Sequence, residues 1–206
     1  MSRDYFKENR LKKLIILFIL TFGFSDEIQK AYLNSYNYEK IGDYKDAIKV
    51  LIPVYKKYPK GYTLNLRLGY LFYMDKKYTN AITYYQKASL SLPYSFEAKL
   101  GIMKVYLTIG EYQKTIEIGY SIIKNDYYNY YANLYTIQAL KKLKKYQDAT
   151  NLANKMINIY PTDITYLVNL AKIYEITNPK YAQILYKNSI LILDPNNVSA
   201  KIFLNR

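Results

Sequence analysis

The sequence contains neither cysteine nor histidine. Without cysteine there are no disulfides, no thiolate nucleophile and no cysteine-ligated zinc. Without histidine, the other usual zinc sites and every nucleophile that relies on an imidazole base are excluded as well. No motif places the remaining carboxylates beside a second reactive group. We therefore expect no enzymatic activity, no catalytic residue, no metal site and no cofactor.

Glycine and proline are scarce, with 7 and 6 copies among 206 residues. The glycines are not arranged as a phosphate-cradling loop, and long flexible linkers need more glycine or proline than this chain has. Half of the residues are apolar, which is enough to bury a core. We expect a chain that is compact throughout.

Tyrosine and lysine are abundant instead. There are 28 tyrosines, and 30 basic residues against 16 acidic ones give a formal charge of +14. An AT-rich genome encodes such a composition without selection for function. The composition therefore does not by itself separate a functional surface from codon bias.

The first 25 residues have the pattern of an export signal. The stretch "MSRDYFKENRLKK" is net positive, and the apolar run "LIILFILTFGF" that follows is shorter than the roughly 20 residues that span a bilayer. Gly23 and Ser25 then supply small residues for cleavage. We expect residues 1–25 to be a signal peptide of an exported, periplasmic protein. The alternatives are an inner-membrane anchor through residues 11–24 and a buried amphipathic helix.

The rest of the chain repeats itself every 34 residues, a period that identifies helical repeat architectures. A small residue follows three positions after each member of a tyrosine series, and prolines recur with the same period, Tyr127 standing in the one slot without proline. The tyrosines are Tyr44, Tyr78, Tyr112 and Tyr146; the small residues are Ala47, Ala81, Thr115 and Ala149; the prolines are Pro59, Pro93, Pro161 and Pro195.

This pattern resembles the tetratricopeptide repeat (TPR), a unit of two antiparallel helices. The resemblance implies an all-α, right-handed α-solenoid of about five helix-turn-helix repeats plus a C-terminal partial helix. The expected repeats are 28–61, 62–95, 96–129, 130–163 and 164–197 within a domain of residues 26–206, and the terminal helix is 198–206. Apolar residues recur on one face of both helices of each unit, and neighbouring units must stack to bury those faces.

Three departures from the pattern predict local irregularities. Gly119 stands where a bulky residue is expected, which makes the third repeat the loosest copy. The second helix of the fifth repeat uses Ala182, Tyr186 and Ser189, one residue early, after a shortened turn. Pro53 lies inside a predicted helix, where it removes the hydrogen bond to the Lys49 carbonyl, so we expect a bend that costs about 3 kcal/mol if nothing compensates.

The family binds its partners on a concave face made mainly by the first helices. Carried over to this chain, that face is aromatic and basic, which suits a peptide or a helix of another protein. The expected partner contacts are Tyr32, Tyr36, Arg67, Tyr70, Tyr73, Lys104, Tyr131, Tyr135, Gln138, Asn169 and Lys172. The resemblance thus implies a non-enzymatic interaction or scaffolding module of the bacterial cell envelope. The alternative in which these tyrosines merely cover neighbouring helices stays open.

The densest basic cluster, "KKLKKYQD", lies at the turn of the fourth repeat. It is either a solvated turn or a contact for an acidic protein or a membrane surface, through Lys141, Lys142, Lys144 and Lys145. Nucleic acid is not an expected partner, because an exported protein seldom meets it. Alternative functions are a structural subunit of an outer-membrane or secretion assembly and a basic module that binds membranes or polyanions.

Overall fold

The computed structural model describes residues 26–205, which contain helices and no strand. These residues form two compact units that divide between Leu92 and Pro93. The predicted signal peptide lies outside the described residues. Among the described helices, none is long and apolar enough to cross a bilayer.

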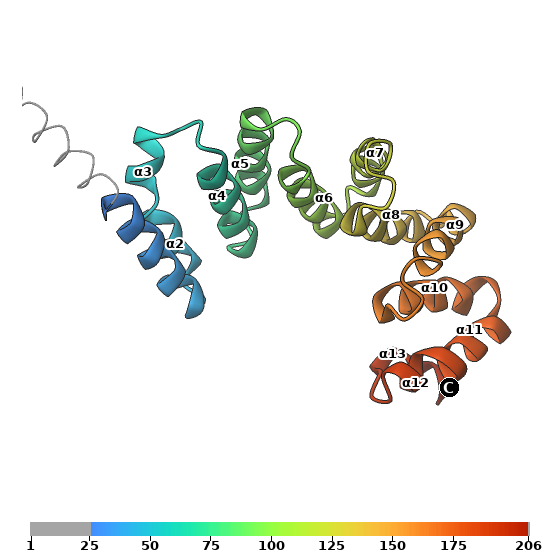
Figure 1. Ribbon diagram of the computed structural model, residues 1–206. Helices are drawn as coiled ribbons and strands as arrows, with labels where there is room; N and C mark the ends of the chain where they lie inside the picture. The colour runs from blue at the N-terminus through green and yellow to red at the C-terminus, as the bar shows by residue number, and fades with distance from the viewer. Residues whose placement is uncertain (1–25, 206) are drawn as a thin grey trace, which may run out of the picture. The chain divides into compact units, whose positions relative to one another are not determined.

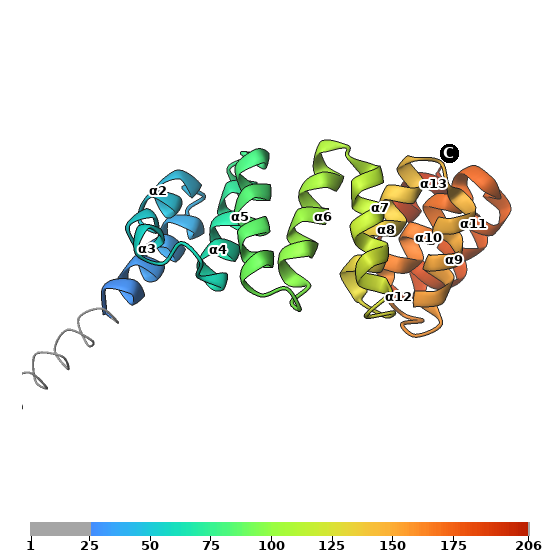
Figure 2. The same cartoon turned by 90° about the horizontal axis from the view of Figure 1, so that it is seen from above.

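The first unit holds the first two helix pairs (Figure 1). Its helices are residues 26–40, α2 (Tyr44–Lys49), α3 (Ile52–Lys57), α4 (Tyr62–Met74) and α5 (Tyr78–Ser91). α4 and α5 run side by side, as both views show (Figure 2). α2 also contacts α4, so the two pairs pack on each other.

The second unit holds the remaining pairs and a terminal helix. Its helices are α6 (Glu97–Ile109), α7 (Tyr112–Ile123), α8 (Tyr130–Lys142), α9 (Tyr146–Ile157), α10 (Ile164–Thr177), α11 (Pro179–Leu185), the π-helical segment η1 (Tyr186–Ile190), α12 (Leu191–Leu193) and α13 (Val198–Leu204). Each first helix contacts its own partner and the next first helix, as α8 contacts α9 and α10. The predicted order of paired helices is confirmed.

Four turns between paired helices end the first helix in the same way. The residue at the turn has a positive φ, and the amide of the next residue donates to the carbonyl five positions earlier, as in a Schellman motif. The positive-φ residues are Gly42, Lys76, Gly110 and Lys144. The closing bonds are Asp43 N to Tyr38 O, Lys77 N to Phe72 O, Glu111 N to Tyr106 O and Lys145 N to Leu140 O, each 2.9 Å. The 34-residue period thus includes the backbone of the turn, although two of the four positions lack glycine.

The third repeat is not loosely packed, contrary to expectation. In the second repeat Gly69 faces the Tyr85 ring, and a Cβ at Gly69 would lie 2.7 Å from it. In the third repeat the large residue is on the first helix: a Cβ at Gly119 would lie 2.9 Å from Met103 Cε and would also collide with Thr136 Oγ1 of α8. The small and large residues have exchanged helices, so the pair fills its space in both repeats.

The fifth repeat absorbs its shifted register through η1. Asn178 both ends α10 and caps α11, so the second helix starts one residue early. η1 then accommodates one extra residue, as π-bulges do. As a result Ile190 is fully buried and Ser189 is only half-buried. The expectation for Ser189 was wrong: Ile190 fills the position that Met156 fills one period earlier.

Pro53 interrupts its helix as predicted. α2 ends at Lys49 and α3 begins at Ile52, with Pro53 in the first turn of α3. The chain passes the break through a tight turn in which Leu51 N donates to Ile48 O at 2.9 Å. Leu51 and Val54 remain buried on the two sides of the break, so the interruption leaves the apolar face intact.

The terminal helix packs on the fifth repeat through part of its expected face. Phe203 meets the buried Tyr186 ring with centroids 5.3 Å apart, and Ala200 is fully buried. Val198 and Ile202, also expected to pack there, are 69% and 55% exposed. α13 therefore leaves apolar side chains at the surface of the second unit.

Candidate functional site

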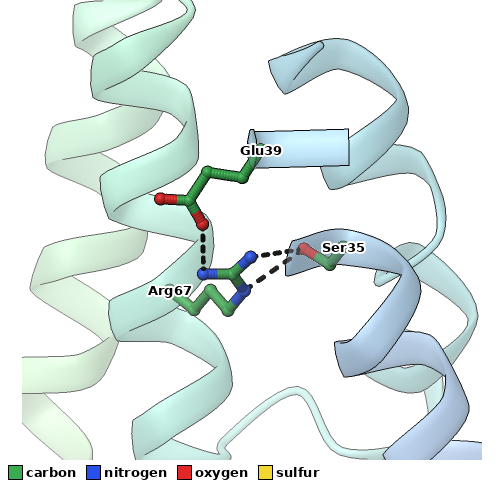
Figure 3. A network of polar contacts seen from close by, with 3 residues as sticks. All are labelled: Ser35, Glu39 and Arg67. Carbon is green, nitrogen blue, oxygen red and sulfur yellow. Dashed lines mark hydrogen bonds and ion pairs between the residues drawn. The ribbon is translucent and has the colours of Figure 1, made fainter. Parts of the chain in front are cut away.

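The expected contacts of the first unit form a network with one another. The Arg67 guanidinium, on α4, pairs with Glu39 at 2.9 Å and donates to Ser35 Oγ from Nη2 at 2.9 Å and from Nε at 3.2 Å. Figure 3 shows both partners on the first helix, facing Arg67 across the interface of the two repeats. The guanidinium also stacks on the Tyr36 ring, 3.6 Å from its centroid.

Arg67 is consequently not available to a partner. Its side chain is only 8% exposed and is held by Ser35, Glu39 and Tyr36. The expectation that it binds another protein is wrong, because the physical role of this arginine is to join the first and second repeats.

Tyr70 belongs to the same network. Burial raises its pKa to about 12, and a hydrogen bond to Glu39 contributes to the shift. Tyr32 is half-buried and its pKa is raised, first by burial and then by Tyr36. Tyr73 is half-buried, with its ring 6.0 Å from that of Tyr78. Of these expected contacts, Tyr36 presents the most open surface, at 48% exposure.

In the second unit, α8 places expected contacts along one stripe. Tyr131, Tyr135, Gln138 and Lys142 are three or four residues apart, which puts them on one face of the helix. The rings of Tyr131 and Tyr135 are 5.8 Å apart, and Tyr131 is 53% exposed. The stripe passes from aromatic side chains to basic ones toward the C-terminus of α8.

Other tyrosines of this unit have a structural role. Tyr166 is fully buried and its hydroxyl donates to Tyr130 O at 2.6 Å. The Tyr130 hydroxyl in turn donates to Asp163 at 2.9 Å. Burial raises the pKa of both phenols. The open alternative for the tyrosines therefore holds for these two residues.

A pocket of about 260 Å³ lies over the inner helices α6, α8 and α10; we call it the α8–α10 pocket. The predicted contacts Gln138, Asn169 and Lys172 line it together with Lys141 of the predicted basic turn. Its lining is Leu107, Tyr112, Gln138, Lys141, Lys142, Val168, Asn169 and Lys172. Lys104, the contact expected on α6, is exposed and does not line it.

A second pocket of about 500 Å³ adjoins the first; we call it the α10–α13 pocket. Both pockets are lined by Lys141, Lys142 and Lys172, so these lysines form the boundary between them. The lining of the second pocket is Lys141, Lys142, Lys144, Tyr146, Lys172, Glu175, Ile176, Ser199, Ile202 and Phe203.

Lys141 differs from the other lysines of the predicted basic turn. It lies in the last turn of α8, is half-buried, and donates to Asn169 Oδ1 at 3.2 Å. Burial lowers its pKa to about 8, and the neighbouring Lys172 and Lys142 ammonium groups add to the effect while Glu175 opposes it. Its interpretation as part of a solvated turn was wrong, because it lies between two packed helices.

The other predicted polar contacts divide by exposure. Lys142, Lys144 and Lys145 are exposed, and Lys145 precedes the first residue of α9. Asn169 is only 8% exposed and its amide donates to Thr165 O at 2.9 Å. Because both polar ends of Asn169 are engaged, it positions Lys141, and its expected role as a direct partner contact is wrong.

The prediction from sequence missed the apolar wall formed by Ile176, Ile202 and Phe203. A usable signal exists for Ile202, which lies one 34-residue period after Val168, a residue of the inner face. The prediction also treated Lys141 and Lys172 as members of two different surfaces, whereas they line the same pockets. Within residues 26–205, no cluster of acidic side chains has the composition of a metal site.

Comparison with known proteins gives likenesses of structure. No family model matches the sequence, and no curated protein resembles it significantly in sequence. A structure of MamA residues 41 to the end from Desulfovibrio magneticus RS-1 superimposes with a TM-score of 0.73 at 16% identity, covering 84% of this chain and 98% of that one. A thermophilic TPR protein of Thermus thermophilus gives 0.65 at 11% identity, covering 86% and 97%.

A chain of the APC/C hetero-tetramer Cut9-Hcn1 gives a TM-score of 0.67 at 17% identity, covering 84% of this chain and 34% of that one. At these identities the likeness concerns the fold. The helix pairs, the period of 34 residues and these superpositions together show that the chain has the fold of a tetratricopeptide-repeat protein.

Proposed function

We propose that the chain is a non-enzymatic protein-binding module, and that the inner face of α8, α10 and α13 binds an acidic segment of another protein. The observation that carries the proposal is the pair of adjoining pockets that share three lysines, Lys141, Lys142 and Lys172. Ligand sites of proteins are typically concavities of this size with a few convergent polar groups.

Electrostatics favour a negatively charged ligand at this boundary. Lys172 and Lys142 both lower the pKa of Lys141, which means that the three ammonium groups repel one another. A bound carboxylate would relieve this repulsion and make charge-assisted hydrogen bonds. The aromatic stripe of Tyr131 and Tyr135 on the same face of α8 offers rigid contact area to the rest of the partner segment.

The concave setting favours a protein segment over a flat anionic surface. Lys142 and Lys144 line a pocket wall beside Tyr146 and Phe203. A membrane would be met by lysines that protrude together from one convex surface. Nucleic acid stays outside the proposal, as do catalysis and a cofactor.

Photo-crosslinking in the native host tests the proposal. A crosslinking residue at Gln138 or Tyr135 is expected to capture a defined protein. The matched control positions are Gln147 and Asn151, which are exposed on α9 and line neither pocket. Equal or stronger capture from the α9 positions would overturn the assignment to the inner face.

Charge reversal provides the second arm. The double variant Lys142→Glu/Lys172→Glu is expected to abolish the crosslink from Tyr135. The control Lys124→Glu/Lys180→Glu changes the net charge equally at exposed lysines outside both pockets. If both double variants weaken capture to the same extent, the attraction is due to net charge and the proposed site is wrong.

We further propose that the protein acts in the bacterial periplasm after export by residues 1–25. This rests on the positive segment and the short apolar run of the sequence. Cell fractionation followed by mass analysis of the mature protein tests it: a mass that begins after Ser25 supports export with cleavage, and an intact chain in the cytosol contradicts it.

A further inference from the structure

The α10–α13 pocket has two chemically different walls. Lys141, Lys142, Lys144 and Lys172 supply a cationic wall, and Ile176, Ile202 and Phe203 supply an apolar one. Ile176 and Ile202 are 60% and 55% exposed, so this apolar surface is open to a ligand. A purely acidic ligand would use the first wall and leave the second in water.

The charges around this pocket are unbalanced. Glu175 is the acidic residue of the lining, against four lysines. Its carboxylate accepts a hydrogen bond of 2.7 Å from the Tyr186 hydroxyl, which fixes it beside α11 and η1. The Lys141 ammonium is held toward α10 by the neutral amide oxygen of Asn169. The cationic wall therefore complements one or two carboxylates of a partner.

The size of the pocket limits what can enter it. About 500 Å³ accommodates a few side chains of a peptide but no folded surface. Because the two walls belong to one cavity, the side chains that enter them must be close neighbours in the partner.

We propose that the α10–α13 pocket recognises a partner segment in which an aspartate or glutamate is adjacent to a large apolar residue such as leucine or phenylalanine. The carboxylate contacts the lysines, and the apolar side chain packs on Ile176, Ile202 and Phe203. The inference rests on the proposed function and specifies the class of partner that this site accepts.

Fluorescence anisotropy with the full chain and three synthetic dodecapeptides tests this. One peptide contains adjacent Asp and Leu or Phe residues, the second replaces the apolar residues by serine, and the third replaces aspartate by asparagine. The first is expected to bind at least about tenfold more tightly than either of the others, because burying one large apolar side chain is worth about that factor.

Matched variants separate the two walls. Ile202→Ser is expected to weaken the mixed peptide about tenfold and to leave the serine peptide unchanged. Val198→Ser is the control, because Val198 is an exposed apolar residue of the same helix that does not line the pocket. Circular dichroism verifies that both variants keep the helical content of the wild type.

The outcomes distinguish this inference from the proposed function. If the mixed and serine peptides bind equally and Ile202→Ser has no effect, the inference is overturned, while loss of both on Lys142→Glu/Lys172→Glu still supports the acidic-segment site. If no peptide binds and charge reversal leaves the in vivo crosslink intact, both are wrong. If the chain sediments as a dimer that Ile202→Ser dissociates, a second copy occupies the wall and the inference is overturned.

Discussion

At the scale of the residue, the same side-chain type has different roles according to its neighbours. Lys142 and Lys144 are exposed, while Lys141 on the same chain segment is half-buried against Asn169. Arg67 has the residue type of a binding arginine, yet Ser35 and Glu39 occupy its donors. Burial and pairing, which depend on the adjacent repeat, decide whether a charge is available.

Lys141 predicts a specific dependence of stability on pH. Its pKa is about 8 in the folded chain, below its ordinary value of 10.5. Between these two pH values the unfolded chain holds a proton that the folded chain has released, so stability gains a contribution as pH rises through this window. The difference in unfolding free energy between wild type and Lys141→Met, measured by urea titration, is expected to increase from pH 8 to pH 10.

The same titration affects binding in the opposite direction. Lys141 faces Lys142 on its own helix and Lys172 and Glu175 on α10. As Lys141 loses its charge above pH 8, affinity for the acidic probe peptide is expected to fall, and Lys141→Met is expected to flatten this fall. A constant stability difference between wild type and variant across the window would contradict the assignment.

Arg67 predicts a large loss of stability. In Arg67→Met the Glu39 carboxylate, 23% exposed, loses its ionic partner. Breaking a buried pair from one side costs about 3–5 kcal/mol, and the partial exposure of Glu39 places the expectation near the lower end, about 3 kcal/mol. Urea unfolding followed by circular dichroism measures it.

The double variant Arg67→Met/Glu39→Met provides the control for this interpretation. It removes both charges and is expected to be more stable than the sum of the single losses allows. Strict additivity of the two single substitutions would mean that the pair does not couple the repeats.

At the scale of the element, the turns and the second helices keep the repeat geometry despite changes of residue type. Lys76 and Lys144 adopt the left-handed conformation that Gly42 and Gly110 adopt in the alternate repeats. η1 adds a residue that returns Ile190 to the position expected from the period. Packing against neighbouring helices imposes these conformations, because each displaced side chain would leave a space in the core.

Lys76→Gly is therefore expected to stabilise the chain. The left-handed conformation costs a residue with a side chain about 1–2 kcal/mol, and the greater entropy of glycine in the unfolded chain cancels part of that gain. The expected net effect is about 0.5–1 kcal/mol, measured by thermal unfolding. Lys76 is exposed and lines neither pocket, so binding of the probe peptides should not change.

Gly42→Ala is the matched control for this turn. A Cβ at Gly42 meets nothing within 4 Å, so its cost arises from the backbone alone. It is expected to destabilise the chain by about 1 kcal/mol. Equal stabilities of Lys76→Gly and wild type, with a loss at Gly42, would show that Lys76 makes a compensating contact.

At the scale of the whole molecule, the described residues form two compact units built from one repeat. In repeat proteins each unit contacts mainly its neighbours, so a local lesion lowers stability locally before it lowers it throughout. Arg67 contacts a residue 32 positions earlier and Lys141 contacts a residue 28 positions later, which shows the range of such coupling.

Hydrogen exchange tests this locality. Leu68→Ala, at a fully buried position of α4, is expected to cost about 2–5 kcal/mol and to lower amide protection in α4 and α5 more than in α10. Ile173→Ala, equally buried in α10, should give the reverse pattern. A uniform loss of protection in both variants would indicate a single cooperative unit.

The fold could be predicted from the sequence because the repeat is written in local terms. Tyr44, Tyr78, Tyr112 and Tyr146 each begin the second helix of a pair, and Ala47, Ala81, Thr115 and Ala149 are fully buried one turn later. Helix periodicity, turn chemistry and the 34-residue spacing depend on residues close along the chain, so they are visible before the chain is folded.

The candidate site depends on residues that are far apart along the chain. Only the packing of α8, α10 and α13 brings Lys141, Lys172 and Ile202 into the lining of one pocket. Likewise, only the contact of the first two repeats buries Arg67 against Glu39. Spacing along the chain determines which face of a helix a residue occupies, whereas the neighbouring helix determines whether that face is open, paired or buried, and this decided where a partner can bind.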